Sequence, residues 1–358
     1  MSRFLADQYQ SLVAYTPGEQ PTDMKYIKLN TNESPFPPSE GVLAAISKER
    51  VAELRLYSDP TCGILREKIA KQFGVQKTNV FVSNGSDDIL NFSFMAFCDG
   101  SRTGVAFPEI SYGFYSVYAD LHGVDAKKIP LTPDFRVDYA DYLNAGRTVV
   151  IANPNAPTGI ALSVSEIEEI VKSNPDHVVL IDEAYVDFGA ESCLPLVEKY
   201  DNLLVVRTFS KSYSLAGARL GFAIGNEALI QDLEKIKYST NPYNINRLSL
   251  LAGAAAMDEN DYYMENCRKI EANRAYTTQA LENLGFSVLP SSANFIFAKS
   301  DAIGGEALYL ELKKRGILVR HFTTESIKEY NRITIGTMEE MQVLVETVRK
   351  ILSEQASV

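Results

Sequence analysis

The sequence predicts an α/β fold in which a mainly parallel central sheet is flanked by helices, with a smaller α+β domain after it. Short apolar runs alternate with helical patterns over most of the chain, which is the order of elements in α/β proteins. This alternation ends near residue 249, where a long helical stretch precedes only two further strand-like runs. A chain of 358 residues is long enough for one large domain with a smaller one attached.

Six apolar runs are expected to form the strands of the central sheet. They are rich in β-branched or aromatic residues and do not alternate strictly with polar residues, as expected for strands buried on both faces. Helical segments such as 86–97 and 165–172 lie between them. In chain order, the predicted strands are 79–83, 104–107, 147–152, 177–181, 203–206 and 220–224.

The chain divides into three predicted parts. Residues 1–40 are polar and rich in proline, which fixes φ and lacks an N–H donor, so they predict an extended arm. A large domain over 41–248 contains the sheet, and a small domain over 249–358 follows. The small domain is expected to consist of a helical stretch over 248–284, strands at 294–298 and 332–335, and a final helix over 338–353.

Composition and charge exclude several classes of function. The formal net charge of −11 disfavours nonspecific nucleic-acid binding, which needs a cationic face. No run of about 18 apolar residues predicts a membrane span. The first residues break to polar side chains before any apolar segment of a secretory signal appears. We therefore expect a cytoplasmic protein that binds neither nucleic acid nor membrane.

Cysteine and histidine usage predicts neither a disulfide framework nor a metal site. No two cysteines form a C-x-x-C pair, and no two histidines are spaced i, i+4. Scattered cysteines of this kind are typical of reduced thiols in a cytoplasm. The residues concerned are Cys62, Cys98, Cys193, Cys267, His122, His177 and His321.

Polar residues that follow the predicted strands are the candidates for a ligand site, because ligands bind beyond the carboxyl ends of strands in open α/β sheets. After the first strand, Gly85 permits a tight turn and Ser86 is placed to cap a helix whose N–H groups face an anion. An ordinary capped helix has the same pattern. The segment 153–159, Asn-Pro-Asn-Ala-Pro-Thr-Gly, is a rigid shaped loop or simply a turn.

Two further strand ends carry charged side chains. Asp182 ends a buried strand, where a carboxylate is costly unless it meets a cation such as a protonated ring nitrogen or a structural arginine. Lys211 follows another strand, between hydroxyl residues, and Arg219 comes eight residues later. A partly desolvated lysine near other cations is a competent nucleophile that forms imines, although a lone lysine is usually a solvated surface group.

Together these four pieces resemble the aminotransferases of pyridoxal phosphate (PLP) fold type I and, within them, the histidinol-phosphate aminotransferases. The resemblance covers nearly the whole chain. Its most specific parts are Asp-Glu-Ala-Tyr at 182–185 and Thr-Phe-Ser-Lys at 208–211, with the family's spacing of eight to Arg219. Further segments that match in kind are 14–18, 29–35 and 242–246.

The resemblance implies the roles of the cofactor residues. Lys211 would hold PLP through an imine, and Asp182 would pair with the pyridine nitrogen. Tyr185 would donate toward the 3-oxygen of the ring, and Tyr112 would stack on its face. The residues that would hold the phosphate are Gly85, Ser86, Asp87, Thr208, Ser210 and Arg219.

The resemblance also implies substrate contacts and an assembly. Arg332 and Arg320 look like the family's substrate-anion arginines, although either is otherwise read as a strand-edge arginine in solvent. Tyr15 and Asn32 of the arm would lie nearby. Tyr57 looks like the tyrosine that family members lend to the neighbouring subunit's phosphate, which implies a homodimer with shared active sites.

One residue departs from the family pattern. Family members commonly have an asparagine just before Pro-Thr-Gly that binds the ring oxygen, and here that position is Ala156. Either Asn155 replaces it through a shifted loop, or Tyr185 alone serves that oxygen. Losing one such hydrogen bond costs about 1 kcal/mol.

The expected activity is transfer of an amino group between histidinol phosphate and 2-oxoglutarate, giving imidazole acetol phosphate and glutamate. An aromatic or broad-range aminotransferase would carry the same cofactor residues, and a threonine-phosphate decarboxylase shares much of the fold. A PLP-fold regulatory module would need a basic DNA-binding domain, for which the chain has no room. An NAD enzyme is disfavoured, because no G-x-G-x-x-G follows the first strands.

Overall fold

The computed structural model describes residues 4–99 and 103–355. Its largest element is a seven-stranded sheet of order β2-β8-β7-β6-β5-β3-β4, which confirms the predicted α/β class. Only β8 runs antiparallel to its neighbours; the remaining neighbouring pairs are parallel. The strands are β2 (Val80–Ser83), β3 (Val105–Pro108), β4 (Ala126–Ile129), β5 (Thr148–Ala152), β6 (Val179–Asp182), β7 (Leu203–Thr208) and β8 (Gly221–Gly225).

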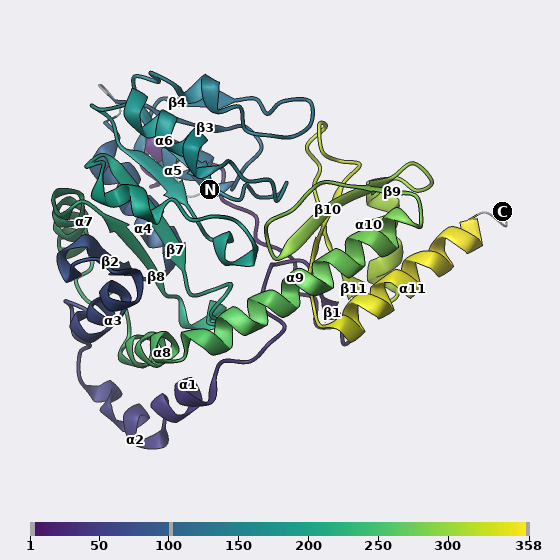
Figure 1. Ribbon diagram of the computed structural model, residues 1–358, viewed down its shortest axis with the longest axis horizontal. Coiled ribbons are helices and arrows are strands. Elements are labelled where there is room, and N and C mark those ends of the chain that lie inside the picture. Colours follow the sequence, from purple (N-terminus) through teal and green to yellow (C-terminus); the bar gives the residue numbers. More distant parts are fainter. Residues whose placement is uncertain (1–3, 100–102, 356–358) are drawn as a thin grey trace.

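Helices cover both faces of this sheet (Figure 1). Side chains of α4, α5 and α7 form one apolar core with the sheet, and those of α3, α6 and α8 form another on the opposite face. Each face is therefore apolar, as the absence of polar alternation in the strands predicts. The helices are α1 (Glu40–Ala45), α2 (Lys48–Val51), α3 (Gly63–Phe73), α4 (Gly85–Phe97), α5 (Phe114–His122), α6 (Val164–Ser173), α7 (Glu227–Thr240) and α8 (Arg247–Asp258).

The C-terminal part of the chain contains a second, antiparallel sheet of order β12-β13-β10-β9 with its own apolar core. The long helix α9 leads from the large sheet toward it (Figure 1). Its elements are α9 (Asn260–Glu282), β9 (Phe286–Val288), β10 (Phe295–Ser300), α10 (Gly305–Lys314), β11 (Ile317–Leu318), β12 (Arg320–His321), β13 (Asn331–Thr334) and α11 (Met338–Gln355).

The N-terminal arm joins the second core. Strand β1 (Ile27–Lys28) pairs in parallel with β11, and Leu29 is 1% exposed among the side chains of that core. Asn32 follows with a φ of 57°. This part of the arm is thus anchored far along the chain, which places residues 30–33 at the junction of the two sheets.

Two local features go beyond what the sequence predicted. The stretch 248–284 is two helices, because Glu259 leaves helical geometry (φ −113°, ψ 33°) and its carboxylate accepts a hydrogen bond from the N–H of Gly41. Strand β4 was not expected, because Lys127 and Lys128 interrupt any apolar run. Exposed lysines are typical of edge strands, where they discourage pairing with another chain.

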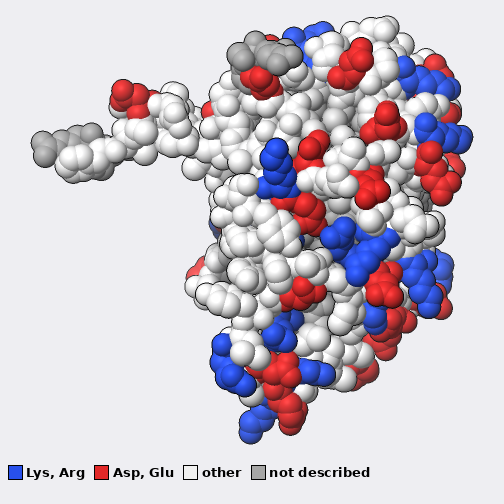
Figure 2. Space-filling model, turned by 90° about the vertical axis from the view of Figure 1, so that its left-hand side faces the viewer, with Lys and Arg blue, Asp and Glu red and all other residues white. Residues whose placement is uncertain are grey.

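The described chain also contains short 3-10 helices, and its surface carries charged side chains of both signs. Lys and Arg lie interspersed with Asp and Glu on the face shown in Figure 2. Within residues 4–99 and 103–355, no helix is both long and apolar enough to cross a membrane. The 3-10 helices are Asp7–Tyr9, Ala52–Arg55, Lys77–Asn79, Tyr139–Tyr142, Val186–Phe188, Leu194–Glu198 and Ala216–Ala218.

Replacing Gly221 by Ala should destabilise the fold. A Cβ atom there would lie 2.4 Å from the backbone nitrogen of Ser86 and 2.6 Å from the carbonyl carbon of Gly85. Because these are backbone atoms at the start of α4, we expect a loss of about 1–3 kcal/mol in the free energy of unfolding. Urea unfolding of the cofactor-free protein measures it. Gly217→Ala is the matched control, since nothing lies within 4 Å of its Cβ position, and an equal loss in both variants would contradict the steric argument.

Candidate active site

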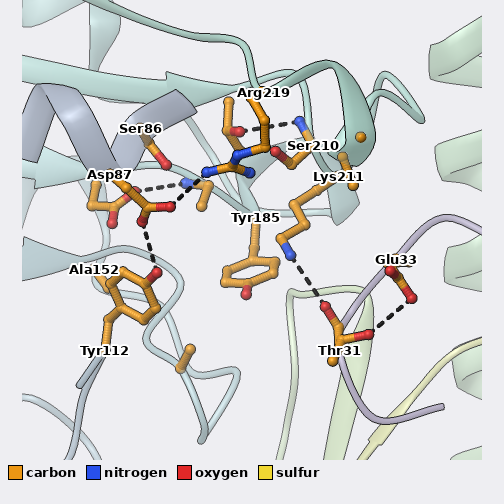
Figure 3. A pocket seen from close by; sticks show the side chains of 16 residues that line it. Thr31, Glu33, Ser86, Asp87, Tyr112, Ala152, Tyr185, Ser210, Lys211 and Arg219 are labelled. Atoms are coloured by element: carbon orange, nitrogen blue, oxygen red, sulfur yellow. Dashed lines mark hydrogen bonds and ion pairs between the residues drawn. The ribbon is translucent and has the colours of Figure 1, made fainter. Parts of the chain in front are cut away.

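A cavity of about 340 Å³ lies at the carboxyl ends of β5, β6 and β7, beside the N-terminus of α4 (Figure 3). The parallel register places Ala152 of β5 next to Asp182 of β6, which in turn pairs with Val206 of β7. Strand ends that are distant in sequence therefore meet at one edge. The cavity is lined by Thr31, Glu33, Ser86, Asp87, Tyr112, Ala152, Ala156, Asp182, Ala184, Tyr185, Thr208, Ser210, Lys211, Ala216, Gly217 and Arg219.

Lys211 projects into this cavity from the turn after β7. Its Nζ atom donates a hydrogen bond to the backbone oxygen of Thr31 at 3.3 Å, and it lies 5.8 Å from the centre of the Tyr185 ring. No carboxylate of the described residues is within ion-pair distance of this amine. The amine is thus held at the cavity wall without a fixed counter-ion.

Asp182 is buried at the end of β6 and lacks a cationic partner among the described residues. Its carboxylate accepts hydrogen bonds from the Tyr115 hydroxyl at 2.9 Å and the Ala184 N–H at 3.2 Å. Burial raises the pKa of Asp182 to about 6, against the lowering effect of these two donors. A cation placed in the cavity beside this carboxylate would compensate its burial.

Glu183, the next residue, is hydrogen-bonded and ion-paired on the other side of the strand. Its carboxylate accepts hydrogen bonds from the Ser192 hydroxyl at 2.6 Å and the Cys193 N–H at 2.7 Å, and it lies 3.9 Å from Arg207. Successive side chains of a strand point to opposite faces. Of the two acids, only Asp182 therefore lines the cavity.

The N-terminus of α4, Arg219 and Asp87 lie together at one end of the cavity. The Nη2 atom of Arg219 contacts the carboxylate of Asp87 at 2.7 Å, and Ser86 and Ser210 lie beside it (Figure 3). Gly85 has a φ of +84°, and a Cβ there would lie 2.7 Å from Arg219. The glycine thus allows the guanidinium to approach the helix N-terminus, where N–H groups and the helix dipole favour an anion.

Two tyrosines flank the middle of the cavity. The hydroxyl of Tyr112 donates to Asp87 at 2.7 Å, and burial followed by this neighbouring carboxylate raises the pKa of Tyr112. The hydroxyl of Tyr185 accepts a hydrogen bond from Asn32 at 3.0 Å. In Figure 3 both rings border the space between Lys211 and Asp87.

A second cavity of about 560 Å³ continues from the first and shares Thr31, Tyr112, Ala156, Tyr185 and Lys211 with it. Its wall contains two arginines and two side chains of the arm that were predicted to contact substrate. These are Arg320, Arg332, Tyr15 and Asn32.

The two arginines are register partners on β12 and β13. Arg332 donates to the backbone oxygen of Asn30 at 3.0 Å, and Arg320 donates to the backbone oxygens of Thr16 and Pro17. Burial lowers the pKa of Arg332, and its Nε atom has no partner among the described residues. Two neighbouring guanidinium groups without a carboxylate form a site for an anionic ligand.

The expected cofactor contact of Asn155 does not fit the geometry of its loop. Its amide donates to the Ile110 carbonyl and the Thr158 hydroxyl, and its amide oxygen accepts from Ser111. Both amide hydrogens are thus used within the loop, which is not shifted toward the cavity. Ala156 lines the cavity instead and presents only a methyl group.

Tyr57 does not line either cavity. It is 79% exposed and stacks on Tyr243 with ring centres 4.6 Å apart. An aromatic ring so exposed is available for contact with another chain.

Sequence reasoning missed two polar residues that line the first cavity and one that supports Asp182 from behind. Thr31 and Glu33 reach the cavity from the arm, where they share a hydrogen bond of 2.8 Å, and Tyr115 binds Asp182 from α5. The aromatic spacing of 112 and 115 was the only signal for Tyr115, and such spacing is ordinary in a buried helix. Thr31 and Glu33 belong to the matched segment 29–35 but carry no chemical signal of their own.

Metal binding finds no support in this region. Among the described residues, no group of three or more His, Cys, Asp or Glu side chains is arranged to hold a metal ion.

Comparison with known proteins gives consistent matches over nearly the whole chain. The model of the family "Aminotransferase class I and II" matches residues 24–348. A histidinol-phosphate aminotransferase of Brachyspira hyodysenteriae is 52% identical over 353 residues, which are 98% of this chain and 99% of that protein. One of a Marinomonas species is 49% identical over 354 residues, 98% and 100% of the two chains.

A solved structure agrees in fold. The crystal structure of histidinol-phosphate aminotransferase from Sinorhizobium meliloti in complex with pyridoxal-5'-phosphate is 26% identical. It aligns with a TM-score of 0.87 over 99% of this chain and 98% of that chain.

Replacing Asp182 by Asn should remove a pH dependence of stability from the cofactor-free protein. The carboxyl titrates near pH 6 in the folded chain but near its ordinary value in the unfolded chain, so unfolding releases a proton over this interval. As pH rises from about 4 to 7, the unsubstituted protein should lose about 2 kcal/mol more stability than Asp182→Asn. Urea unfolding of both proteins across this range checks it. Parallel pH profiles would contradict the buried, unpaired carboxylate.

Proposed function

The chain belongs to the family of class I and II aminotransferases, and from that premise we propose that it transfers the amino group of histidinol phosphate to 2-oxoglutarate with PLP as cofactor. The single observation that carries this proposal is the meeting of three groups in one cavity. These are the Lys211 amine, the unpaired carboxylate of Asp182 and the anion site at the start of α4. Relatives named for this reaction, at 49–52% identity over nearly the full chain, support the choice of substrate.

The residues present fit PLP. A pyridinium nitrogen would supply the cation that the buried Asp182 carboxylate lacks, and the phosphate would meet Arg219, Ser86, Ser210 and the N–H groups of α4. Tyr112 and Ala184 border the space for the flat ring. The fit rests on two features of the cavity. One is the Asp182 carboxylate, which has no cationic partner among the described residues, and the other is the set of hydrogen-bond donors at the start of α4.

When bound, PLP supplies an aldehyde that condenses with amines and a ring that withdraws electrons from the substrate carbon. Lys211 lines both cavities, and its Nζ atom would act as the general base that takes the proton of the substrate carbon that carries the amine. Asp182 holds a proton at the ring nitrogen by its charge. Tyr185 donates its hydroxyl hydrogen toward the ring oxygen, a contact that we assign to it alone because Asn155 is engaged in its loop.

Arg332 and Arg320 are the proposed binding groups for the anionic end of both substrates. A guanidinium fork binds phosphate or carboxylate with two hydrogen bonds. The same pair therefore accepts the phosphate of histidinol phosphate and, in the second half of the reaction, the distal carboxylate of 2-oxoglutarate. Tyr15, which stacks on Phe114 with ring centres 4.3 Å apart, closes this cavity from the arm.

We further propose a cytoplasmic homodimer with shared active sites. The exposed Tyr57, surrounded by exposed Leu54 and Leu56, is suited to enter the phosphate end of a second copy's cavity. All four cysteines are free, as is typical of a reducing compartment.

The reaction is tested by mixing the PLP-loaded protein with histidinol phosphate or, separately, with phenylalanine. Rapid conversion of the cofactor's visible absorption to that of its amine form by histidinol phosphate, with phenylalanine slow, is expected. Lys211→Ala should lower turnover by at least ~10³-fold, because it removes the general base. Conversion by phenylalanine alone would replace the proposed substrate with an aromatic amino acid, and release of carbon dioxide would replace transamination with decarboxylation.

Sharing of active sites is tested with Tyr57→Phe. Removing a hydroxyl that donates to a phosphate should weaken PLP binding about tenfold. The sedimented mass should remain that of two chains. Tyr276→Phe, which removes the hydroxyl of an exposed tyrosine of α9 that lines neither cavity, is the control and should bind PLP normally. A monomer with unchanged PLP affinity would overturn both the dimer and the shared site.

A further inference from the structure

The hydroxyl of Tyr185 has one hydrogen-bond partner among the described residues. The Nδ2 atom of Asn32 donates to its oxygen at 3.0 Å, within the usual range for an N–H···O bond. Since the phenol oxygen accepts this bond, its own hydrogen is free to point elsewhere, and it meets no acceptor in the described chain. The hydroxyl lies at the boundary of both cavities.

The amide of Asn32 is itself held in one orientation. Its oxygen accepts a hydrogen bond from the Thr334 hydroxyl at 3.0 Å, while the same hydroxyl oxygen accepts the Asn32 backbone N–H at 3.0 Å. This reciprocal pair fixes which end of the amide faces Tyr185. Asn294 also donates to the Asn32 carbonyl at 3.0 Å, and Asn32 is 1% exposed. A φ of 57° is a conformation that asparagine tolerates better than most residues.

One side of the Tyr185 ring packs against apolar side chains. Ala156, Ala293 and Phe295 form a small apolar cluster against it, and the Phe295 ring packs edge-on with centres 5.1 Å apart. The phenol is therefore fixed by packing on one side and by a single amide on the other. The strength of the Tyr185 hydroxyl as a hydrogen-bond donor therefore depends on the Asn32 amide.

We propose that Asn32 is a positioning residue that acts through Tyr185, directing the phenol hydrogen into the cavity and strengthening it as a donor to the cofactor's ring oxygen. A hydroxyl that accepts a hydrogen bond is polarised and becomes a stronger donor. The chain Thr334–Asn32–Tyr185 compensates for the methyl group of Ala156, which cannot donate. This inference rests on the proposed function, since it assumes that PLP occupies the cavity.

The same chain connects the cofactor to the substrate site. Thr334 lies two residues after Arg332 on β13, and Asn32 lies two residues after Asn30, whose carbonyl accepts the Arg332 hydrogen bond. Asn32, predicted from the sequence to contact substrate, lines the second cavity, and its amide also binds Tyr185 and Thr334.

The test is a spectroscopic titration of the PLP-loaded protein. A strong donor at the ring oxygen stabilises negative charge there, which lowers the pH at which the nitrogen joining Lys211 to PLP releases its proton. Asn32→Gly, chosen because glycine tolerates the positive φ, should raise the midpoint of the visible absorption change by about 0.5–1 pH unit. Thr334→Val should raise it less, because it only frees the amide to turn.

A double-mutant cycle separates this role from a structural one. In a Tyr185→Phe background, Asn32→Gly should cause no further shift of the midpoint. Asn30→Gly is the matched control, since Asn30 is an equally buried arm asparagine whose amide donates to the Glu19 carbonyl, and it should leave the midpoint unchanged. If Asn32→Gly does not bind PLP, the same double-mutant cycle is measured with Thr334→Val in place of Asn32→Gly.

Two results would overturn the inference alone. One is an unchanged midpoint in Asn32→Gly with a normal visible band, and the other is an equal shift with and without the Tyr185 hydroxyl. Absence of the visible band from the unsubstituted protein would instead overturn the cofactor assignment, and this inference with it.

Discussion

The parallel pairing of β5, β6 and β7 is the constraint on which the rest of the site depends. Because these strands run in one direction, Ala152, Asp182 and the turn after Thr208 end at a single edge of the sheet. The N-terminus of α4 opens at the same edge, and close backbone contact at Gly221 brings it against β8. Every group proposed to hold the cofactor is placed by this edge, so the core that buries the strands also fixes the chemistry.

The site carries charges that the fold leaves uncompensated. Among the described residues, Asp182 is buried with hydrogen-bond donors but no cation, and Arg320 and Arg332 adjoin each other without an ion-paired carboxylate. Glu183 and Arg207, one position away from the site residues, are by contrast paired and hydrogen-bonded. Since Glu183 and Arg207 are buried and paired, burial alone does not explain why Asp182 and the two arginines lack partners of opposite charge. Stability is given up where a cationic ring and an anionic substrate are to bind.

The N-terminal arm connects the residues proposed to hold the cofactor with those proposed to bind the substrate. Its strand β1 is bound to β11, its Leu29 belongs to the core around the second sheet, and its residues Thr31 and Asn32 reach Lys211 and Tyr185. A segment that pairs with a strand nearly 300 residues later cannot be positioned by local sequence preference. Its anchoring makes the arm a wall of the cavity, and it brings the substrate arginines and the cofactor residues into one hydrogen-bonded assembly.

The sequence by itself determined the class of fold and the six strands that consist of apolar runs. These follow from local composition and spacing, which the chain carries wherever it folds, whereas the roles expected of Lys211, Asp182 and Arg219 came from the resemblance of their segments to a known family. Only the tertiary structure decided the break at Glu259, the edge strand with Lys127 and Lys128, the engagement of Asn155 in its loop, and the amide of Asn32 on Tyr185. Each of these depends on a partner far away in the chain, and the direction of a side chain toward such a partner has no local signature.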